Sequence, residues 1–141
     1  MSSREHIKND LLERKISAII RTDNQKVAEQ AMQAAVDGGF RVVEFTLTTP
    51  GALNLITQFR ENDDLIVGAG TVMSPTLVQE AVQAGAQFLV SPVCNIHVIQ
   101  EAVKLNVVSI PGTFTPTEME TAYQAGADFV KLFPAPANVA E

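Results

Sequence analysis

The sequence has few of the residues that build covalent cross-links or metal sites. Cys94 is its one cysteine, so no disulfide can form within the chain and no cysteine cluster can hold a metal. The two histidines, His6 and His97, are isolated from each other, and we expect neither to be a metal ligand. The sequence therefore predicts a protein that uses no metal or other cofactor, in a reducing compartment.

Long hydrophobic runs and positive charge are lacking as well. No stretch reaches the roughly 18 consecutive apolar residues of a spanning helix, and residues 1–15 are charged and do not resemble a signal peptide. The formal net charge of −6 disfavours binding to nucleic acid or to an acidic membrane surface. We therefore expect a cytoplasmic protein with neither partner, in which local cations or backbone N–H groups bind any anionic substrate.

A repeating strand and helix pattern fills the chain. Short apolar runs rich in β-forming residues recur with centres roughly 20 to 24 residues apart, the spacing of a strand–helix unit with a three-turn helix. These runs are Ser17–Arg21, Arg41–Leu47, Leu65–Ala69, Phe88–Ser91, Val107–Ile110 and Phe129–Phe133. The segments between them have helical periodicity, so the pattern predicts an α/β protein with a parallel sheet covered by helices.

Helix boundaries are marked by short polar and glycine signals. Thr22 with Gln25, and Thr115 with Glu118, have the spacing of a capping box, and Ser74 opens another helix. Glycines at 38–39, 85 and 126 fall where the helices end and the chain turns toward the next strand. Similar sequences surround these three joins, which indicates an internal repeat of one structural unit.

Two architectures fit strict strand–helix alternation: a doubly wound open sheet and a closed (β/α)₈ TIM barrel. The Gly-x-Gly at residues 68–70 has Met73 where a dinucleotide-binding motif needs its third glycine, which weakens the first. Uniform spacing without a long crossover favours the barrel. A barrel has eight units and six are visible. We therefore expect one domain over residues 1–141, with an N-terminal helix at 3–15 and a barrel truncated after the sixth strand, its last two units missing.

Two ionisable residues are predicted to point into the barrel. Alternation in the second and sixth strands places Glu44 and Lys131 on the inward face, while the opposite faces are apolar and suit packing against helices. One interpretation is a structural ion pair. The other is chemistry, because buried ion pairs stabilise poorly and a lysine flanked by Phe129 and Phe133 can react as a neutral amine. Glu44 would then transfer protons.

Further candidates lie at the carboxyl ends of the strands. Arg21 ends the first strand and could bind a carboxylate or phosphate, although it could also be a surface charge paired with Asp23. Thr71 follows two glycines and could hold a carboxylate, or it could simply cap the next helix. Cys94 has no histidine partner nearby in sequence, so we expect it to be inert.

Five ordered motifs resemble those of the 2-keto-3-deoxy-6-phosphogluconate and 4-hydroxy-2-oxoglutarate aldolases. They are Val-Val-Glu-Phe-Thr-Leu at 42–47, Val-Gly-Ala-Gly-Thr-Val at 67–72, Gly-Ala-Gln-Phe-Leu-Val-Ser-Pro at 85–92, Ile-Pro-Gly at 110–112 and Phe-Val-Lys-Leu-Phe-Pro-Ala at 129–135. The resemblance covers nearly the whole chain. It implies a (β/α)₈ barrel, a homotrimer, and cleavage of a 2-keto-3-deoxy sugar acid through a lysine imine.

The resemblance also implies roles for individual residues. The imine-forming lysine corresponds to Lys131, the proton-transferring glutamate to Glu44, the threonine that binds the pyruvate carboxylate to Thr71, and the proline after the fourth strand to Pro92. Many members have an arginine where this chain has Thr48. Some relatives instead have one at the end of the first strand, as Arg21 is here. This departure bears on the choice of substrate, with Thr48 and Arg21 both expected at the substrate.

Three functions remain open at this point. The first is a class I (Schiff-base) aldolase, a lyase that cleaves 2-keto-3-deoxy-6-phosphogluconate to pyruvate and glyceraldehyde 3-phosphate without a cofactor. The second is a non-catalytic module, derived from an aldolase, that holds a small keto acid or assembles with a partner. The third is other phosphosugar chemistry on the same barrel, such as isomerisation, in which Lys131 would only bind anions.

Overall fold

The computed structural model describes residues 3–135. Its helices are α1 (Ser3–Arg14), α2 (Gln25–Asp37), α3 (Ala52–Phe59), α4 (Pro75–Gln83), α5 (Ile96–Lys104) and α6 (Pro116–Gln124). Its strands are β1 (Ala18–Ile20), β2 (Val42–Thr46), β3 (Ile66–Gly70), β4 (Phe88–Ser91), β5 (Val108–Thr113) and β6 (Lys131–Leu132). Strand and helix alternate after α1, as the sequence predicts.

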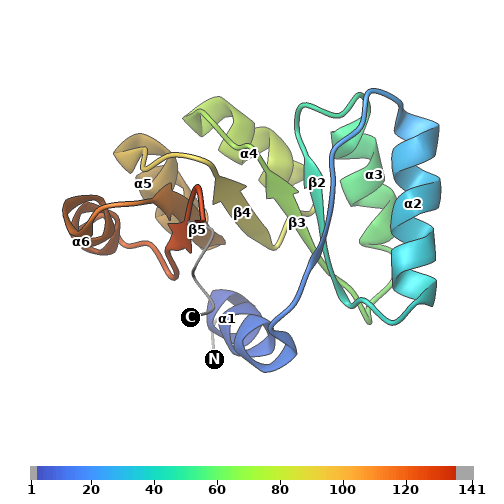
Figure 1. Cartoon of the computed structure of the whole chain (residues 1–141), viewed down its shortest axis with the longest axis horizontal. Coiled ribbons are helices and arrows are strands. Elements are labelled where there is room, and N and C mark those ends of the chain that lie inside the picture. Colours follow the sequence, from blue (N-terminus) through green and yellow to red (C-terminus); the bar gives the residue numbers. More distant parts are fainter. Residues whose placement is uncertain (1–2, 136–141) are drawn as a thin grey trace.

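The six strands form one parallel sheet in the order β1-β2-β3-β4-β5-β6. A doubly wound sheet reverses its strand order at a switch point, whereas strands that follow one another in chain order have the connectivity of a barrel. Figure 1 shows that the sheet curves, with α2 to α6 along its outer side and α1 on the other side. The described residues therefore form a curled, half-barrel α/β sheet.

The outward faces of the strands pack against the helices. Val43 and Phe45 point outward from β2 and are fully buried in a core that includes Met32 of α2 and Phe59 of α3. The rings of Phe45 and Phe59 meet edge to face, with centroids 5.1 Å apart. This is the apolar outer face that the alternation in β2 predicts.

A second, smaller core lies on the concave side of the sheet. Val42, Ile66, Phe88, Val90 and Val108 of β2 to β5 gather there. The first helix contributes Ile7, which is buried, and Leu11, which packs against this core; the partly buried Ile110 and Phe129 also contact it. Helix α1 therefore covers part of the inner face of the sheet, a position that its sequence does not specify.

Most of the predicted helix boundaries are confirmed and one is wrong. Thr115 and Glu118 form the capping box at the start of α6, and Ser74 caps α4. The cap of α2 is Asn24, whose side chain accepts a hydrogen bond from Val27 N, and not Thr22. The Thr22 hydroxyl instead accepts from the Asn24 backbone N–H, so Thr22 shapes the turn before the helix.

The last two strands differ from their predicted bounds. β5 continues past Ile110 through Pro111 and Gly112 to Thr113, because its backbone stays paired with β4 and then with β6. β6 is only Lys131–Leu132, shorter than the apolar run around it. Gly112 has no room for a Cβ, since the backbone of Pro92 lies against it. The glycine is thus required by close packing between the ends of β4 and β5.

Candidate active site

Glu44 is a buried carboxylic acid on the inner face of the sheet. It lies in the middle of β2, paired in register with Gly68 of β3, and only 4% of it is exposed. Its carboxylate packs directly over Gly70, where an added Cβ would collide with Oε1. Gly70 therefore makes the space that the Glu44 side chain occupies.

Burial changes the acidity of this group. Loss of hydration raises the pKa of Glu44 from its ordinary 4.5 to about 7, and the positive charges of Lys131 and Arg21 limit the rise. A carboxyl group with a pKa near 7 is present in both protonation states at neutral pH. It can therefore give up a proton at one step of a reaction and accept one at another.

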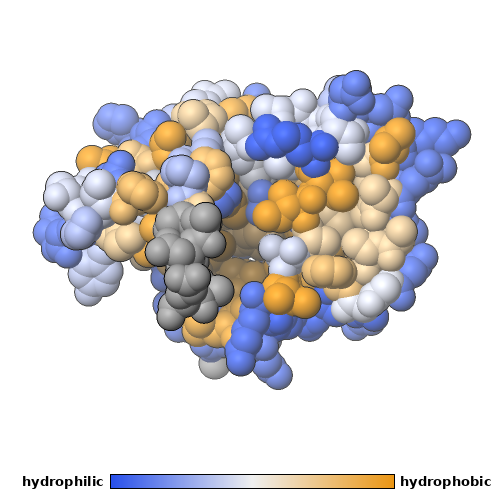
Figure 2. All heavy atoms as spheres, viewed as in Figure 1, coloured by the Kyte–Doolittle hydropathy of each residue, from blue (hydrophilic) through white to orange (hydrophobic). Residues whose placement is uncertain are grey.

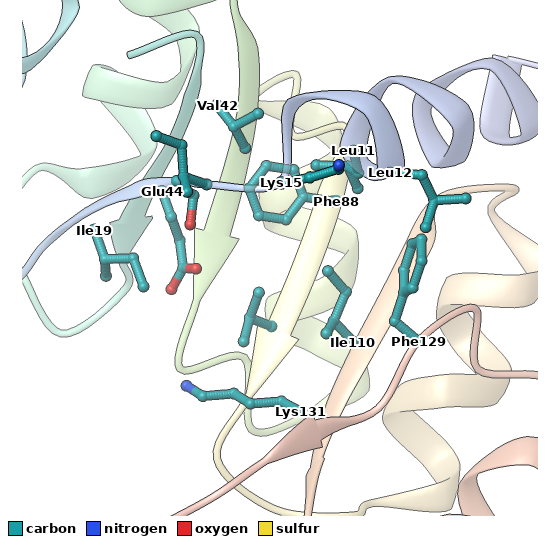
Figure 3. Close-up of a pocket in the computed structure, with 13 residues that line it drawn as sticks. Leu11, Leu12, Lys15, Ile19, Val42, Glu44, Phe88, Ile110, Phe129 and Lys131 are labelled. Carbon is teal, nitrogen blue, oxygen red and sulfur yellow. The ribbon is translucent and has the colours of Figure 1, made fainter. Parts of the chain in front are cut away.

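Lys131 reaches the same region from β6. Its side chain is half-buried, and its Nζ atom lies 4.6 Å from the centre of the Phe133 ring, a cation–π contact. Phe129 lies beside the inner core, but Phe133 is 43% exposed, so the aromatic shield around the amine is less complete than the sequence predicts. In Figure 3, Lys131 and Glu44 extend into one space from β6 and β2.

That space is a cavity of about 420 Å³ on the concave side of the sheet. Figure 2 shows it as a hollow near the middle of the molecule, bordered by hydrophobic side chains. Within the described residues, no nitrogen–oxygen contact of 4.0 Å or less joins Lys131 to Glu44, so the two do not form a direct ion pair. The interpretation of Glu44 and Lys131 as a structural ion pair is therefore wrong.

A second lysine lines the same cavity, which sequence reasoning missed. Lys15 follows α1 with a left-handed backbone, φ 66°, and its side chain borders the cavity together with Leu11, Leu12 and Ile16. In the sequence Lys15 reads as the last residue of an exposed helix. Its position in the cavity depends on how α1 packs against the sheet, which no local sequence pattern predicts.

Three of the predicted binding residues form one cluster at the strand ends. Arg21 donates hydrogen bonds to the Thr48 hydroxyl at 2.9 Å and to the Thr71 hydroxyl at 2.7 Å. The residues follow β1, β2 and β3, whose carboxyl ends meet at one edge of the sheet. Thr71 adopts a left-handed backbone, φ 59°, directly after Gly70. A guanidinium and two hydroxyls in this arrangement have the hydrogen-bonding groups that an anionic ligand needs.

The structure also decides between the alternatives for these residues. Arg21 bonds to the two threonines, and no ion pair with Asp23 is found among the described residues. Thr71 does not cap α4, because Ser74 does. The two structural alternatives are therefore wrong, and the binding roles of Arg21 and Thr71 stay predictions.

Two buried threonines support this cluster and were not singled out from the sequence. The Thr46 hydroxyl lies 3.3 Å from that of Thr48 and 3.2 Å from that of Thr49, and it reaches the Ile20 carbonyl at 3.2 Å. The Thr22 backbone N–H donates to the Thr49 hydroxyl. These bonds fasten the end of β1 to the loop after β2. The run of three threonines in four residues is the one signal that could have indicated them.

Pro92 belongs to neither group: like Arg21, Thr48 and Thr71 it is outside the residues that line the cavity, and it does not contact their cluster. It follows β4 and packs against Gly112, and it does not line the cavity shared by Glu44 and Lys131. Within residues 3–135, no three acidic, histidine or cysteine side chains gather in a way that could hold a metal ion. No helix in that range is long and apolar enough to cross a membrane.

The consecutive parallel strands and the inward amine and carboxyl group define a barrel-type α/β protein with a candidate site on its concave side. The family model of the KDPG and KHG aldolases matches residues 7–140. The chain belongs to this aldolase family.

The chain is similar to named aldolases and to solved structures. It is 36% identical over 128 residues to the 2-dehydro-3-deoxy-phosphogluconate aldolase of Treponema pallidum, covering 89% of this chain and 61% of that protein. It is 39% identical over 107 residues to the KHG/KDPG aldolase of Escherichia coli K12, covering 75% and 50%. The KDPG aldolase of Legionella pneumophila, solved with pyruvate captured as a covalent carbinolamine, gives a TM-score of 0.72 at 30% identity, covering 84% and 57%. The chain thus spans between 50% and 61% of the length of the curated relatives it matches.

Proposed function

We propose that the whole protein is a class I aldolase that cleaves 2-keto-3-deoxy-6-phosphogluconate, a 2-keto-3-deoxy sugar acid, to pyruvate and glyceraldehyde 3-phosphate. Lys131 is the amine that forms the Schiff base. The observation that carries the proposal is the shared cavity, which the Lys131 amine enters from β6 and a carboxyl group with a pKa of about 7 enters from β2. The names of the similar aldolases support the substrate class.

The reaction needs no group beyond this amine and a proton carrier. The neutral Lys131 amine adds to the ketone carbon, and the resulting carbinolamine loses water to give a protonated imine. Removal of the proton from the C4 hydroxyl breaks the C3–C4 bond and releases the aldehyde. The electron pair moves into an enamine, with the imine nitrogen as its sink. Protonation at C3 and hydrolysis of the imine then release pyruvate and restore the amine.

Glu44 carries the protons in this scheme. As an acid it protonates the carbinolamine hydroxyl, which leaves as water, and as a base it removes the proton from the C4 hydroxyl. Both roles require a group whose acid and base forms coexist at neutral pH, as burial provides here. The space over Gly70 lets the carboxylate sit on the inner face beside the substrate instead of packing into the outer core.

The Arg21 cluster binds the carboxylate of the keto acid. Its guanidinium offers a charged, forked donor, and the Thr71 and Thr48 hydroxyls orient that fork through two hydrogen bonds. The positive charge of Arg21 also acts on Glu44, so substrate binding and proton transfer are electrostatically linked. Pro92 packs against Gly112 at the carboxyl ends of β4 and β5 and takes no part in proton transfer.

The remaining proposals concern the whole protein. We propose a closed (β/α)₈ barrel in one domain, assembled as a homotrimer in the cytoplasm. The exposed apolar side chains at both edges of the sheet, Ile19 of β1 and Leu132 of β6, support closure by further strands. Fusing the last two strand–helix units of a similar aldolase to this chain tests closure. Protection of both edge strands from hydrogen exchange is expected, and no gain in protection would contradict it.

Borohydride reduction in the presence of pyruvate tests the imine. We expect one added pyruvate by intact mass, located at Lys131 by peptide mapping, and no label in Lys131→Arg. Lys15→Arg is the matched control because Lys15 lines the same cavity, and this variant should label like the unchanged protein. Label at Lys15 would refute the assigned nucleophile. No label on any lysine would favour a non-catalytic binding module or other phosphosugar chemistry.

A further inference from the structure

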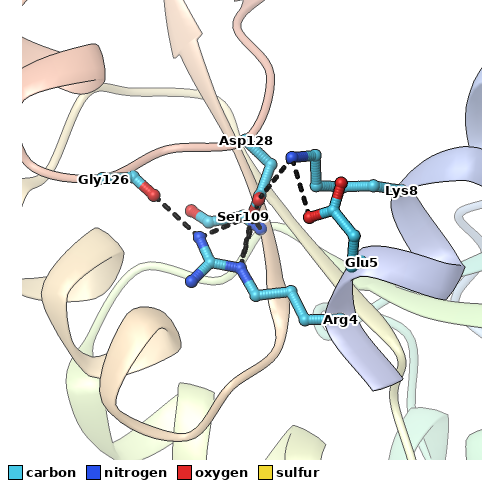
Figure 4. Close-up of polar contacts among 6 residues, drawn as sticks. All are labelled: Arg4, Glu5, Lys8, Ser109, Gly126 and Asp128. Carbon is cyan, nitrogen blue, oxygen red and sulfur yellow. Dashed lines mark hydrogen bonds and ion pairs between the residues drawn. The ribbon is translucent and has the colours of Figure 1, made fainter. Parts of the chain in front are cut away.

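An ion-pair cluster joins α1 to the segment before β6, near the two ends of the described chain. Arg4 of α1 donates from Nε and Nη2 to the Asp128 carboxylate at 2.8 to 3.1 Å, and from Nη2 to the Gly126 carbonyl at 2.8 Å (Figure 4). Lys8 lies 4.0 Å from the same carboxylate. The Asp128 side chain is 6% exposed and that of Arg4 is 18% exposed, so water screens this cluster weakly.

Asp128 also fastens the approach to β6 onto β5. Its carboxylate accepts the Ser109 backbone N–H at 3.0 Å, and its own backbone N–H donates to the Ser109 carbonyl at 3.1 Å. Three residues later along both strands, Lys131 pairs with Gly112. The spacing from Ser109 to Gly112 equals the spacing from Asp128 to Lys131. The Asp128 contact is therefore in register with the β5–β6 ladder.

Register decides on which face of the sheet Lys131 lies. Side chains alternate along a strand, so a slip of one residue would turn the amine away from the cavity and bring Leu132 inward. The β5–β6 ladder is too short to prevent this by itself, since it joins only two residue pairs. Outside the ladder, Phe133 N bonds to the Thr113 carbonyl at one end, and Asp128 bonds to Ser109 at the other.

We propose that the Arg4–Asp128 pair is a positioning clamp for Lys131, through which α1 holds β6 in the register that directs the amine at the substrate. Arg4 and Asp128 act through Lys131 and do not touch the keto acid. The inference rests on the proposed function, because the group that is positioned is the imine-forming amine. It adds a role for α1 beyond covering the inner core.

The test compares Arg4→Met with Arg14→Met, which makes the same substitution on an exposed residue of the same helix. In Arg4→Met we expect faster hydrogen exchange of the peptide that carries residues 129–133. We also expect slower borohydride trapping of pyruvate at Lys131, by up to roughly 100-fold, the loss that a misplacement of about 1 Å can cause. The half-saturating pyruvate concentration should stay unchanged, since Arg4 does not contact the ligand. Arg14→Met should match the unchanged protein in all three.

Arg4→Lys is the conservative variant and guards against a failure to fold. It keeps the charge but loses the forked contact with Asp128. Its hydrogen-exchange rate at residues 129–133 and its trapping rate should therefore lie between those of Arg4→Met and Arg14→Met. A lowered unfolding midpoint in either Arg4 variant, with exchange at 129–133 and trapping per folded molecule unchanged, would overturn the clamp and leave a purely structural ion pair. If pyruvate does not label the unchanged protein, the proposed function fails. The exchange comparison alone then supports or overturns the clamp.

Discussion

Replacement of Glu44 by glutamine should change how the stability of the protein depends on pH. The folded-state pKa of Glu44 is about 7, against an ordinary value of 4.5. Between these pH values the folded protein holds a proton on Glu44 that the unfolded chain has lost. The free energy of unfolding therefore carries a contribution that is fully present below pH 4.5 and is lost as pH rises through 7.

The size of this contribution follows from the two pKa values. Their difference of about 2.5 (7 minus 4.5) corresponds to roughly 3 kcal/mol of unfolding free energy between pH 4 and pH 8. Glutamine has no proton to lose over this range, so Glu44→Gln should lack the contribution. Glutamine also fits the space over Gly70 that the carboxylate fills.

Urea unfolding of both proteins at pH 4, 5, 6, 7 and 8 measures the effect. The difference in unfolding free energy between the original protein and Glu44→Gln cancels the titration of other groups. It should decrease by roughly 3 kcal/mol from pH 4 to pH 8, with most of the change above pH 5. A difference that stays the same at all five pH values would mean that Glu44 ionises as freely in the folded protein as in the unfolded chain, and the burial argument would be refuted.

Three further predictions follow from the site and the caps. Glu44→Gln should slow aldol cleavage by roughly 10² to 10⁴, measured by steady-state kinetics, while borohydride trapping should still detect some imine. Near-normal turnover would mean that another group carries the proton. Gly70→Ala should destabilise the fold by about 1 to 3 kcal/mol, because its Cβ meets the Glu44 carboxylate, and the loss in urea unfolding should shrink when Glu44 is also shortened to Asp. Glu118→Gln should show the opposite pH dependence to Glu44→Gln. Hydrogen bonds from the Phe114 and Thr115 backbones, and from the Thr115 hydroxyl, lower the pKa of Glu118, so its stabilisation is present above pH 4.5 and is lost as pH falls below that; a loss that is equal at pH 3 and pH 7 would contradict the capping role.

Local patterns predicted the elements and the faces of the strands well. Alternation in β2 separates Glu44 from Phe45, and the structure places them on the inner and outer faces as expected. The patterns failed where a neighbouring residue or strand overrides the local preference of a residue. Thr22 and Gln25 have the spacing of a capping box, but Asn24 directly precedes α2 and is its N-cap. β5 was predicted too short because Pro111 and Gly112 are poor strand residues, and contacts with neighbouring strands override this preference.

The sequence indicated which residues gather at the candidate site, but not the hydrogen bonds between them. That Arg21, Thr48 and Thr71 gather at one edge follows from parallel strands, since their carboxyl ends meet there. Their direct hydrogen bonds depend on side-chain conformations and on the left-handed backbone of Thr71, which no spacing rule gives. Lys15 was missed for a similar reason, because its position depends on where a whole helix docks.

The contact between Arg4 and Asp128 spans 124 residues, which orders events during synthesis on the ribosome. At about 5 to 20 residues per second, the nascent chain presents α1 for roughly 6 to 25 s before Asp128 is made. During that interval Ile7 and Leu11 lack the inner-core residue Phe129. Helix α1 can therefore be held to β6 only after all the strands between them have been translated, and until then Ile7 and Leu11 have only the inner-core residues of β2 to β5 to pack against.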